Sequence, residues 1–315
     1  MFAYRLPPLP SIGDILKLYN LDAKKKLSQN FLLDNKLRSK LVCAGGKLKD
    51  CHVIEVGPGP GSLTRNIFQQ KAFHVHVIEK DPRFLPTLEL LKEATYGRLS
   101  IHIGDVLKFD MKPLIPEELK REWEGDTPMI RIIGNLPFSI STPLIFKWLE
   151  QISKRSDIWC FGRVPLTLTF QEEVAQRMVA HPCHFQRSRL SIMCQNWCEV
   201  DHKFVIPGRA FIPKPDVNVS VVYMTPRIKP LIDLDFKLVE KVVFAVFSQR
   251  GKYCKRGVER LFPEHLREEL VKKLLIVSDI DSTKRPYELS MKDFDRIVHC
   301  YAALLEENPT LKKYI

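Results

Sequence analysis

The chain has 315 residues, of which 45% are hydrophobic and 27% charged, so its length and composition exclude both a single small module and global disorder. Its 49 Lys and Arg residues exceed its 37 Asp and Glu residues by 12. This excess favours a polyanionic partner, with nucleic acid as the first expectation and an acidic membrane surface as the alternative. No apolar run approaches the roughly 20 residues of a membrane-spanning helix, and the eight cysteines without a CxxC pair indicate reduced thiols.

The N-terminal segment is basic and contains a proline-rich stretch, Arg5 to Pro10. A run that begins at Ser11 predicts a helix, because a serine commonly caps a helix start. The same composition leaves two interpretations open, a transit peptide or simply a first helix. Asp14, Asp22 and the prolines fit a transit peptide poorly.

Between residues 50 and 170, short apolar runs alternate with helical stretches, which is typical of βαβ units on a buried parallel sheet. Two later β-rich runs flank a proline-marked loop and are expected to extend the sheet antiparallel at its edge. The pattern therefore predicts a doubly wound α/β domain. The expected strands are residues 53–56, 74–78, 100–103, 130–133 and 166–170, followed by 199–205 and 217–225.

After Thr225 the sequence pattern changes from β-rich runs to helical spacing. Prolines 226 and 230 mark a linker, and apolar residues then recur at helical spacing from Phe236 to Phe247, with further helical runs at 266–275 and 291–305. We therefore expect two domains, an α/β domain with an N-terminal extension at residues 1–226 and a small all-helical domain at 227–315.

The strongest local motif lies where the first strand ends and a helix begins. It runs from Glu55 to Gly61 and carries glycines at 57, 59 and 61. Glycines at such a turn allow a nucleotide-like ligand to approach the backbone closely. A dinucleotide fingerprint needs a glycine at position 62, where this chain has Ser62. The spacing therefore favours S-adenosylmethionine over NAD.

Acidic residues follow the next two strands. Glu79 can accept hydrogen bonds from both hydroxyls of a ribose, and Asp105 can accept one from the exocyclic amine of an adenine. The alternative for each residue alone is a helix cap or a solvated loop carboxylate. Their order along successive strand ends favours the cofactor interpretation.

A second motif, Asn135-Leu136-Pro137-Phe138, follows the strand at 130–133. Ligands of open α/β sheets bind at the carboxyl ends of strands, so this turn is expected to face the methyl donor. The Asn135 side-chain oxygen and the Leu136 carbonyl can accept the two hydrogens of an aromatic amine. Pro137 stiffens the turn, and Phe138 offers a face on which a flipped base stacks. An ordinary proline turn is the alternative.

These motifs together resemble the ribosomal RNA adenine dimethyltransferase family over nearly the whole chain. The resemblance rests on Gln29-Asn30-Phe31-Leu32, residues 55–61, Glu79-Lys80-Asp81, Gly104-Asp105-Val106, Asn135 to Phe138, residues 171–175 and residues 211–215. It is closest to the mitochondrial branch, because Arg5 to Pro10, residues 27–34 and Phe138 in the stretch 135–144 match that branch, whereas bacterial relatives usually have Tyr at the position of Phe138.

The resemblance implies a Rossmann-like class I S-adenosylmethionine-dependent methyltransferase domain followed by a helical domain. It implies dimethylation at N6 of two adjacent adenines in the 3′-terminal hairpin loop of mitochondrial small-subunit rRNA, in the matrix, in support of subunit assembly. The expected partner is that hairpin or the assembling small subunit, with the mitochondrial transcription machinery as a further one, and we expect a monomer. With the glycine motif, the expected cofactor residues are Gln29, Asn30, Phe31, Leu32, Gly57, Gly59, Gly61, Glu79, Lys80, Asp105, Val106 and Asn135.

RNA contacts are expected at basic clusters, because phosphate-neutralising and stacking groups suit hairpin RNA. A solvated helix face is the alternative for any one cluster. The candidate residues are Lys24, Lys25, Lys26, Arg187, Arg189, Arg250, Lys252, Lys255 and Arg256.

Other classes of chemistry find little support in the sequence. Cys194 with Cys198, and the stretch His181 to His184, offer no four-ligand arrangement, so no metal is expected. There is no G-x-S-x-G elbow and no P-loop motif. Two alternatives remain: a non-catalytic transcription or ribosome-assembly factor that retains the methyltransferase fold, and a methyltransferase acting on large-subunit RNA.

Overall fold

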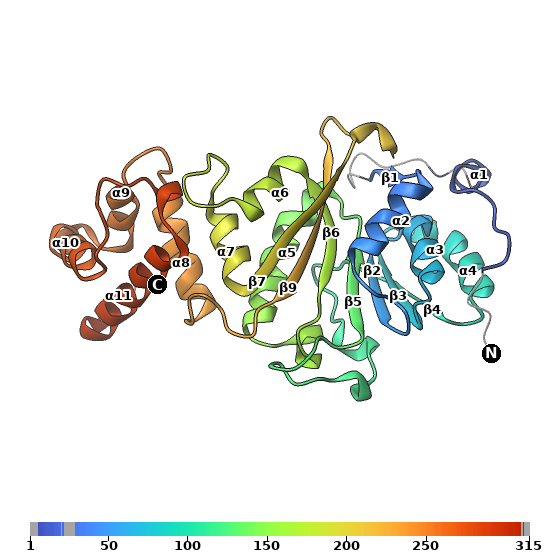
Figure 1. Cartoon of the computed structure of the whole chain (residues 1–315), viewed down its shortest axis with the longest axis horizontal. Coiled ribbons are helices and arrows are strands. Elements are labelled where there is room, and N and C mark those ends of the chain that lie inside the picture. Colours follow the sequence, from blue (N-terminus) through green and yellow to red (C-terminus); the bar gives the residue numbers. More distant parts are fainter. Residues whose placement is uncertain (1–5, 20, 22–28, 310, 312–315) are drawn as a thin grey trace. The chain divides into compact units, whose positions relative to one another are not determined.

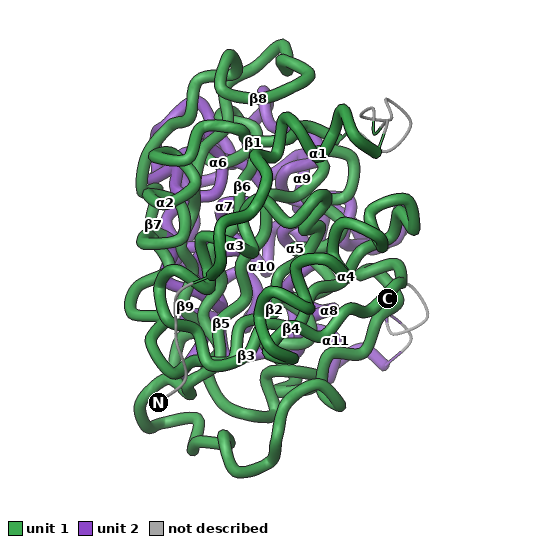
Figure 2. Tube along the Cα trace, turned by 90° about the vertical axis from the view of Figure 1, so that its right-hand side faces the viewer, with its two compact units in different colours: residues 1–175, 201–228 green, residues 176–200, 229–315 purple. Residues whose placement is uncertain are grey.

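The computed structural model describes residues 6–19, 21, 29–309 and 311. The chain divides into two compact units, shown in different colours in Figure 2. Unit 1 comprises residues 1–175 and 201–228, and unit 2 comprises residues 176–200 and 229–315. The chain passes from unit 1 to unit 2 for the last time after residue 228, two residues beyond the boundary expected from the sequence. The segment 176–200, which lies between the two parts of unit 1 in the sequence, groups with the C-terminal helices. Within the described ranges, no helix combines the length and hydropathy needed to cross a membrane.

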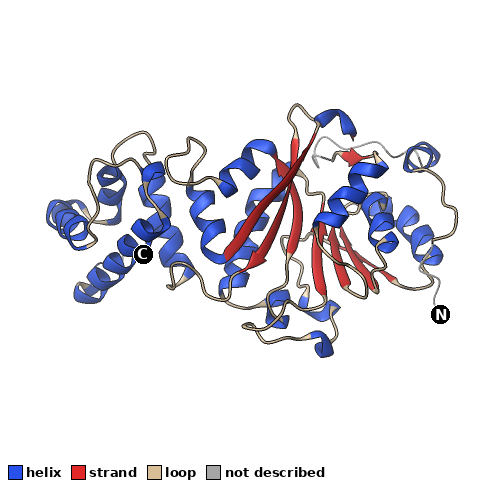
Figure 3. Ribbon diagram, in the orientation of Figure 1, coloured by secondary structure: helices blue, strands red, loops and turns tan. Residues whose placement is uncertain are grey.

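A seven-stranded sheet forms the centre of unit 1 (Figures 1 and 3), with the order β4-β3-β2-β5-β6-β9-β7. The first five strands along this order pair in parallel, and β9 pairs antiparallel with β6. This arrangement confirms the predicted doubly wound α/β class and the antiparallel extension. The strands are β2 (His52–Val56), β3 (His74–Glu79), β4 (Leu99–Ile103), β5 (Ile130–Gly134), β6 (Leu166–Gln171), β7 (Cys198–Ile206) and β9 (Val219–Pro226).

Helices cover the sheet of unit 1. Apolar side chains of α2, α3 and α4 join one buried cluster with Val53, Val75 and Val77 of β2 and β3, so these helices share one face of the sheet (Figure 1). The predicted helix at Ser11 is confirmed, since the Ser11 hydroxyl accepts a hydrogen bond from the Asp14 N–H. The helices are α1 (Ile12–Leu18), α2 (Asn35–Ala44), α3 (Ser62–Gln69), α4 (Leu85–Ala94) and α5 (Phe138–Ser153), and α6 (Glu172–Val179) begins in this unit.

A second, two-stranded sheet pairs β1 (Phe31–Leu32) with β8 (Phe211–Ile212). The pairing places Phe31 opposite Ile212 and Leu32 opposite Phe211, and so joins two segments that are far apart in the sequence. The sequence did not predict these strands, because two residues are too few to show a period.

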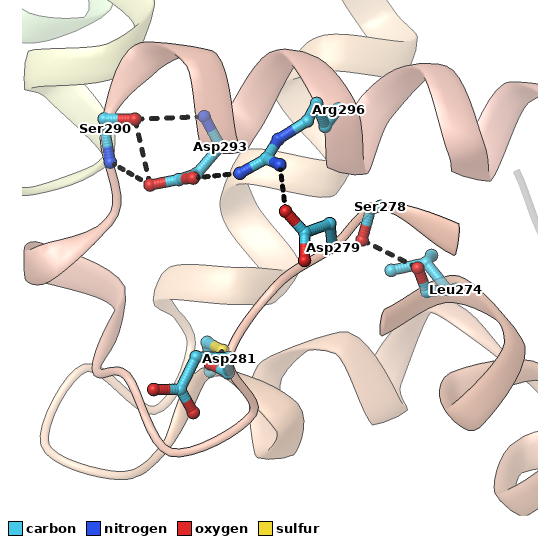
Figure 4. Close-up of polar contacts among 8 residues, drawn as sticks. Leu274, Ser278, Asp279, Asp281, Ser290, Asp293 and Arg296 are labelled. Atoms are coloured by element: carbon cyan, nitrogen blue, oxygen red, sulfur yellow. Dashed lines mark hydrogen bonds and ion pairs between the residues drawn. The ribbon is translucent and has the colours of Figure 1, made fainter. Parts of the chain in front are cut away.

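Unit 2 is helical, and the predicted helices after residue 235 are confirmed. Figure 4 shows the start of α11, where the Ser290 side chain caps the helix and Asp293 accepts from the Ser290 N–H and hydroxyl. Arg296 donates to both Asp293 and Asp279 and so ties the helix to the turn after α10. The helices of unit 2 are α7 (Arg189–Trp197), α8 (Phe236–Phe247), α9 (Cys254–Val258), α10 (Arg267–Val277) and α11 (Met291–Glu307).

Short 3-10 helices occur in the connections of both units. They lie at Pro82–Phe84, Lys112–Leu114, Glu117–Leu119, Asp157–Phe161, Gly208–Ala210, Glu259–Leu261, Glu264–Leu266 and Pro286–Glu288.

Candidate active site

A cavity of about 180 Å³ lies in unit 1 at the carboxyl ends of β2, β3, β4 and β5. This is the edge at which open α/β sheets bind their ligands. Both sequence motifs contribute to it, so the glycine turn and the turn at Asn135 face one space. Its predicted lining residues are Gln29, Asn30, Phe31, Gly57, Gly59, Glu79, Lys80, Asp105, Val106, Asn135, Leu136, Pro137 and Phe138; Val56, Pro58, Ser62, Leu63, Ile78, Phe84, Gly104, Ser139, Ile140 and Phe211 complete it.

Two predicted cofactor residues are not among those that line the cavity. Leu32 is buried, with 3% of its surface exposed, where β1 pairs with β8. Gly61 caps α3 with a φ of 79°, and a Cβ placed there would lie 2.9 Å from Leu91 Cδ2 on α4. A glycine is therefore needed at position 61 for packing, because it allows α3 to approach α4 closely.

The glycine turn is held in place by the acidic residue of the next strand. Gly57 and Gly59 have φ values of 68° and 55°, a region that residues with a side chain rarely adopt. The Gly59 N–H donates to Glu79 Oε2 at 3.0 Å. A Cβ at Gly59 would lie 3.2 Å from the Phe31 ring. The turn thus needs glycine for both its conformation and its close neighbours.

The Glu79 side chain is buried at the end of β3, with 6% of the residue exposed. Its second oxygen, Oε1, accepts from the Asp81 N–H at 2.8 Å. Burial raises the pKa of the Glu79 carboxyl, and the backbone N–H groups of Asp81, Gly59 and Lys80 oppose that effect in part. A carboxylate offers about four acceptor positions, so these N–H groups do not use them all, and a hydroxyl donor such as that of a ribose can still bind.

The loop after β4 carries Asp105, whose Oδ2 pairs with Lys80 Nζ at 2.7 Å. The hydrogen bond from Lys80 lowers the pKa of Asp105, so this carboxylate is ionised at neutral pH and can accept hydrogen bonds. Lys147 of α5 donates to the carbonyls of Val106 and Phe109 at 3.1 and 3.2 Å. The loop is therefore fixed from a helix that the sequence motifs do not include.

The side chain of Asn135 makes two hydrogen bonds at the end of β5. Its Nδ2 donates to the Asn30 carbonyl at 2.9 Å, and its Oδ1 accepts from the Thr169 hydroxyl at 2.9 Å. Pro137 caps α5 with a φ of −58°, and Phe138 begins that helix half-buried at the cavity wall. A Cβ at Gly134 would lie 2.9 Å from the Val56 carbonyl, so a glycine lets β5 approach β2 here.

Glu55, the first residue of the glycine motif, is buried, which the sequence did not predict. Only 1% of the residue is exposed, and neither of its oxygens makes a hydrogen bond of regular geometry. Burial raises the pKa of Glu55 to about 8, Thr64 opposes this effect, and the nearby Glu79 carboxylate adds to it. Glu55 is therefore largely protonated at neutral pH, within electrostatic range of Glu79, the acid that holds the glycine turn.

The predicted RNA-binding residues fall into four groups, of which Arg187 forms one by itself. Lys24, Lys25 and Lys26 lie outside the described residues. Arg189 is half-buried, with its guanidinium 5.3 Å from the Phe244 ring centre. The remaining exposed candidates all belong to unit 2: Arg250, Lys252, Lys255 and Arg256, of which Arg256 pairs with Glu259 at 3.2 Å.

The prediction for Arg187 is wrong. This residue is fully buried in unit 2, and its guanidinium donates to the carbonyls of Ala180 and Leu289. Burial lowers its pKa to about 10. Arg187 therefore joins backbone segments inside the unit and does not present its charge to RNA.

Several lining or supporting residues were not predicted from the sequence. Phe84 is buried and packs edge-on against Phe31, with ring centres 5.6 Å apart, and Phe211 reaches the cavity through the β1–β8 pairing. Among the described residues, no group of three or more His, Cys, Asp or Glu side chains could hold a metal ion. The eight cysteines, all within those residues, are free.

The parallel sheet, the glycine turn after β2 and the acidic end of β3 define a Rossmann-like, S-adenosylmethionine-dependent methyltransferase domain. Within this class, the model of the family described as ribosomal RNA adenine dimethylase matches residues 20–299. The chain belongs to this family, as the motifs predicted.

Relatives named as dimethyladenosine transferases are similar in sequence over almost the full chain. The chain is 52% identical over 311 residues to "Dimethyladenosine transferase 1, mitochondrial" of Xenopus tropicalis, covering 99% of this chain and 90% of the relative. The proteins of the same name from Homo sapiens and Drosophila melanogaster are 52% and 44% identical over 98% of this chain, covering 90% and 93% of their own lengths.

Solved structures share the fold. A dimethyladenosine transferase from Plasmodium falciparum has a TM-score of 0.66 at 23% identity and covers 89% of this chain and 98% of its own. The 23S rRNA methyltransferase ErmE has a TM-score of 0.57 at 21% identity and covers 86% of this chain and 99% of its own. At these identities the likeness concerns the fold alone.

Proposed function

We propose that this chain transfers methyl groups from S-adenosylmethionine to N6 of two adjacent adenines in the 3′-terminal hairpin loop of mitochondrial small-subunit rRNA, and so supports assembly of that subunit. Membership of the rRNA adenine dimethylase family supports the reaction type. The names of the relatives support a mitochondrial location. We infer the matrix as the compartment, because an assembling mitochondrial ribosomal subunit is the expected partner.

One observation carries the proposal: a single cavity is lined both by the glycine turn with Glu79 and by the turn from Asn135 to Phe138. A methyl transfer requires the donor and the acceptor base in one space at close distance. A cavity lined by cofactor-type residues alone would be equally consistent with a binding protein. Because residues for the methyl donor and residues for the target base line the same cavity, the site favours an enzyme.

The residues present fit the proposed cofactor. Glu79 retains acceptor positions beside the backbone N–H groups that it already binds, and the ionised Asp105 stands at the end of the neighbouring strand. In this assignment Glu79 binds the ribose hydroxyls and Asp105 the adenine amine. Bound S-adenosylmethionine supplies an electrophilic methyl group on a sulfonium, which is already an activated leaving group.

The chain's own residues then have to orient a weak nucleophile. The lone pair of an adenine amine is delocalised into the ring, and acceptors for its two hydrogens favour the geometry in which that lone pair is directed at the methyl group. Asn135 Oδ1 and the Leu136 carbonyl are the proposed acceptors, and the half-buried Phe138 ring is the proposed stacking surface. Positioning therefore supplies most of the proposed catalysis.

RNA binding is assigned to the exposed cations of unit 2. Arg250, Lys252 and Lys255 lie within a short segment that also holds Tyr253, a residue that is 56% exposed. Cations that neutralise phosphates beside an exposed aromatic ring suit hairpin RNA.

A reconstituted reaction tests the proposal. Purified protein is incubated with methyl-labelled S-adenosylmethionine and an RNA hairpin with two adjacent loop adenines, and the product nucleosides are analysed by mass spectrometry. N6,N6-dimethyladenosine at both positions is expected, and a hairpin with guanines at those positions is the matched control. In cells that lack the protein, the same two adenines are expected to be unmodified in the small-subunit rRNA.

The alternatives predict different results. A non-catalytic assembly or transcription factor would bind the hairpin without forming dimethyladenosine. A methyltransferase for large-subunit RNA would leave the small-subunit hairpin unmodified and modify a large-subunit fragment. Either result would overturn the proposal.

A further inference from the structure

Thr169 lies on β6, directly beside the Asn135 turn. The parallel pairing of β5 with β6 sets Ile133 opposite Thr167 and Gly134 opposite Leu168, so continuation of this register brings Thr169 next to Asn135. Thr169 is fully buried and is not among the residues lining the cavity. Its hydroxyl donates to Asn135 Oδ1 at 2.9 Å.

The partners of the Asn135 amide determine which way it points. Its other hydrogen bond, at 2.9 Å, goes to the Asn30 carbonyl, a group that can only accept. The nitrogen must therefore face Asn30, and the oxygen must face Thr169. A hydroxyl can donate to that oxygen and leave its second acceptor position free.

We propose that Thr169 is a positioning residue for methyl transfer: its hydroxyl holds the Asn135 amide oxygen in the orientation that accepts the hydrogen of the target amine. This inference rests on the proposed function, because it assigns the free acceptor position of Asn135 to the adenine. Thr169 acts through Asn135 and does not itself contact the substrate.

The chain contains a matched control for this role. Thr167 lies two residues earlier on the same strand and therefore faces the same side of the sheet. It is also buried, with 2% exposed, and its register partner is Ile133. A change from Thr to Val preserves the shape of either side chain, so a comparison of the two positions separates loss of the Asn135 contact from loss of a buried hydroxyl in general.

The experiment compares Thr169→Val, Thr169→Ser and Thr167→Val in the full chain. Methyl transfer to the adenine hairpin is measured as kcat and KM, and S-adenosylmethionine binding as a Kd. We expect Thr169→Val to lower kcat about 10- to 100-fold, because a small misplacement of a reacting group has effects of this size. The Kd and KM are expected to stay close to the wild-type values, Thr169→Ser to restore most of kcat, and Thr167→Val to behave as wild type.

A second measurement does not depend on activity. The side-chain NH₂ resonances of Asn135, assigned by their absence in Asn135→Ala, are expected to shift in Thr169→Val and to remain in place in Thr169→Ser and Thr167→Val. Unchanged resonances in Thr169→Val would overturn the inference. Full kcat in Thr169→Val, or equal losses in both valine variants, would also overturn it. A wild-type protein that does not methylate the hairpin would contradict the proposed function, and the NMR comparison would then still decide whether Thr169 orients Asn135.

Discussion

Replacement of Glu79 by Ala removes two hydrogen-bond acceptors from the centre of the proposed cofactor site. Glu79 accepts from the N–H groups of Gly59 and Asp81, at 3.0 and 2.8 Å. The variant therefore affects the glycine turn as well as the ribose contact. We therefore expect a loss of both stability and cofactor affinity.

A buried N–H without an acceptor costs about 1–3 kcal/mol. The cavity beside Glu79 gives water access to the two freed groups, so we expect the lower end, roughly 2 kcal/mol of lost stability in total. Each hydrogen bond from a ribose hydroxyl to the carboxylate contributes about 1.5–3 kcal/mol, so the loss of even one of the two weakens cofactor binding about 10- to 150-fold, which is the minimum expected for this variant.

Calorimetric titration of S-adenosylmethionine into Glu79→Ala measures the affinity, and urea unfolding measures the stability. Glu79→Gln is expected to lose less affinity, because its oxygen still accepts one N–H. Glu93→Ala, at an exposed position of α4, is the control and should match the wild type. A Glu79→Ala protein that is folded and binds the cofactor with unchanged Kd would refute the ribose assignment.

Three further predictions concern other parts of the chain. Gly59→Ala should lower cofactor affinity and reduce stability by about 1–2 kcal/mol in urea unfolding, because its φ of 55° disfavours a side chain and the new Cβ meets Phe31; wild-type values would contradict this. Glu55 has a pKa raised to about 8 from 4.5, so the folded state retains a proton that the unfolded state releases. The stability present below about pH 4.5 is therefore lost as the pH rises to about 8, by at most about 1.4 kcal/mol per unit. Glu55→Gln should remove this dependence of the unfolding free energy on pH, measured by urea unfolding across that range. An unchanged dependence would contradict the raised pKa of Glu55. Arg187→Ala should reduce stability by at least about 3 kcal/mol, since two buried carbonyls lose a charged donor. Fluorescence anisotropy should show unchanged RNA affinity for Arg187→Ala and weaker binding for Arg250→Glu. Weaker binding by Arg187→Ala together with unchanged binding by Arg250→Glu would show instead that Arg187 contacts RNA.

The strands and the two main motifs could be predicted because their signals are local. The strands β2 to β5 are short apolar runs that end in, or directly before, a glycine or an acidic residue, and the order of Gly57, Glu79, Asp105 and Asn135 follows the order of these strand ends. The carboxyl ends of parallel strands meet at one edge of a sheet, so these residues had to come close together if the sheet formed at all.

The residues that were missed depend on pairing between distant segments. Phe211 reaches the cavity only because β8 pairs with β1, and Thr169 meets Asn135 only through the register of β6 on β5. Arg187 was predicted to contact RNA because it belongs to a basic cluster with Arg189, and a local cluster of cations does not show which of them is buried. The carbonyls that surround it come from residues 180 and 289, and no local pattern brings them together.

Asn135→Ala offers the most direct test of the idea that one cavity serves both the methyl donor and the target base. In one preparation of the variant, the Kd for S-adenosylmethionine and the rate of methyl transfer to the adenine hairpin are both measured. The proposed mechanism predicts that the cofactor still binds while transfer falls to background. Transfer at the wild-type rate would contradict it, because the adenine amine would then be oriented by groups other than the Asn135 side chain.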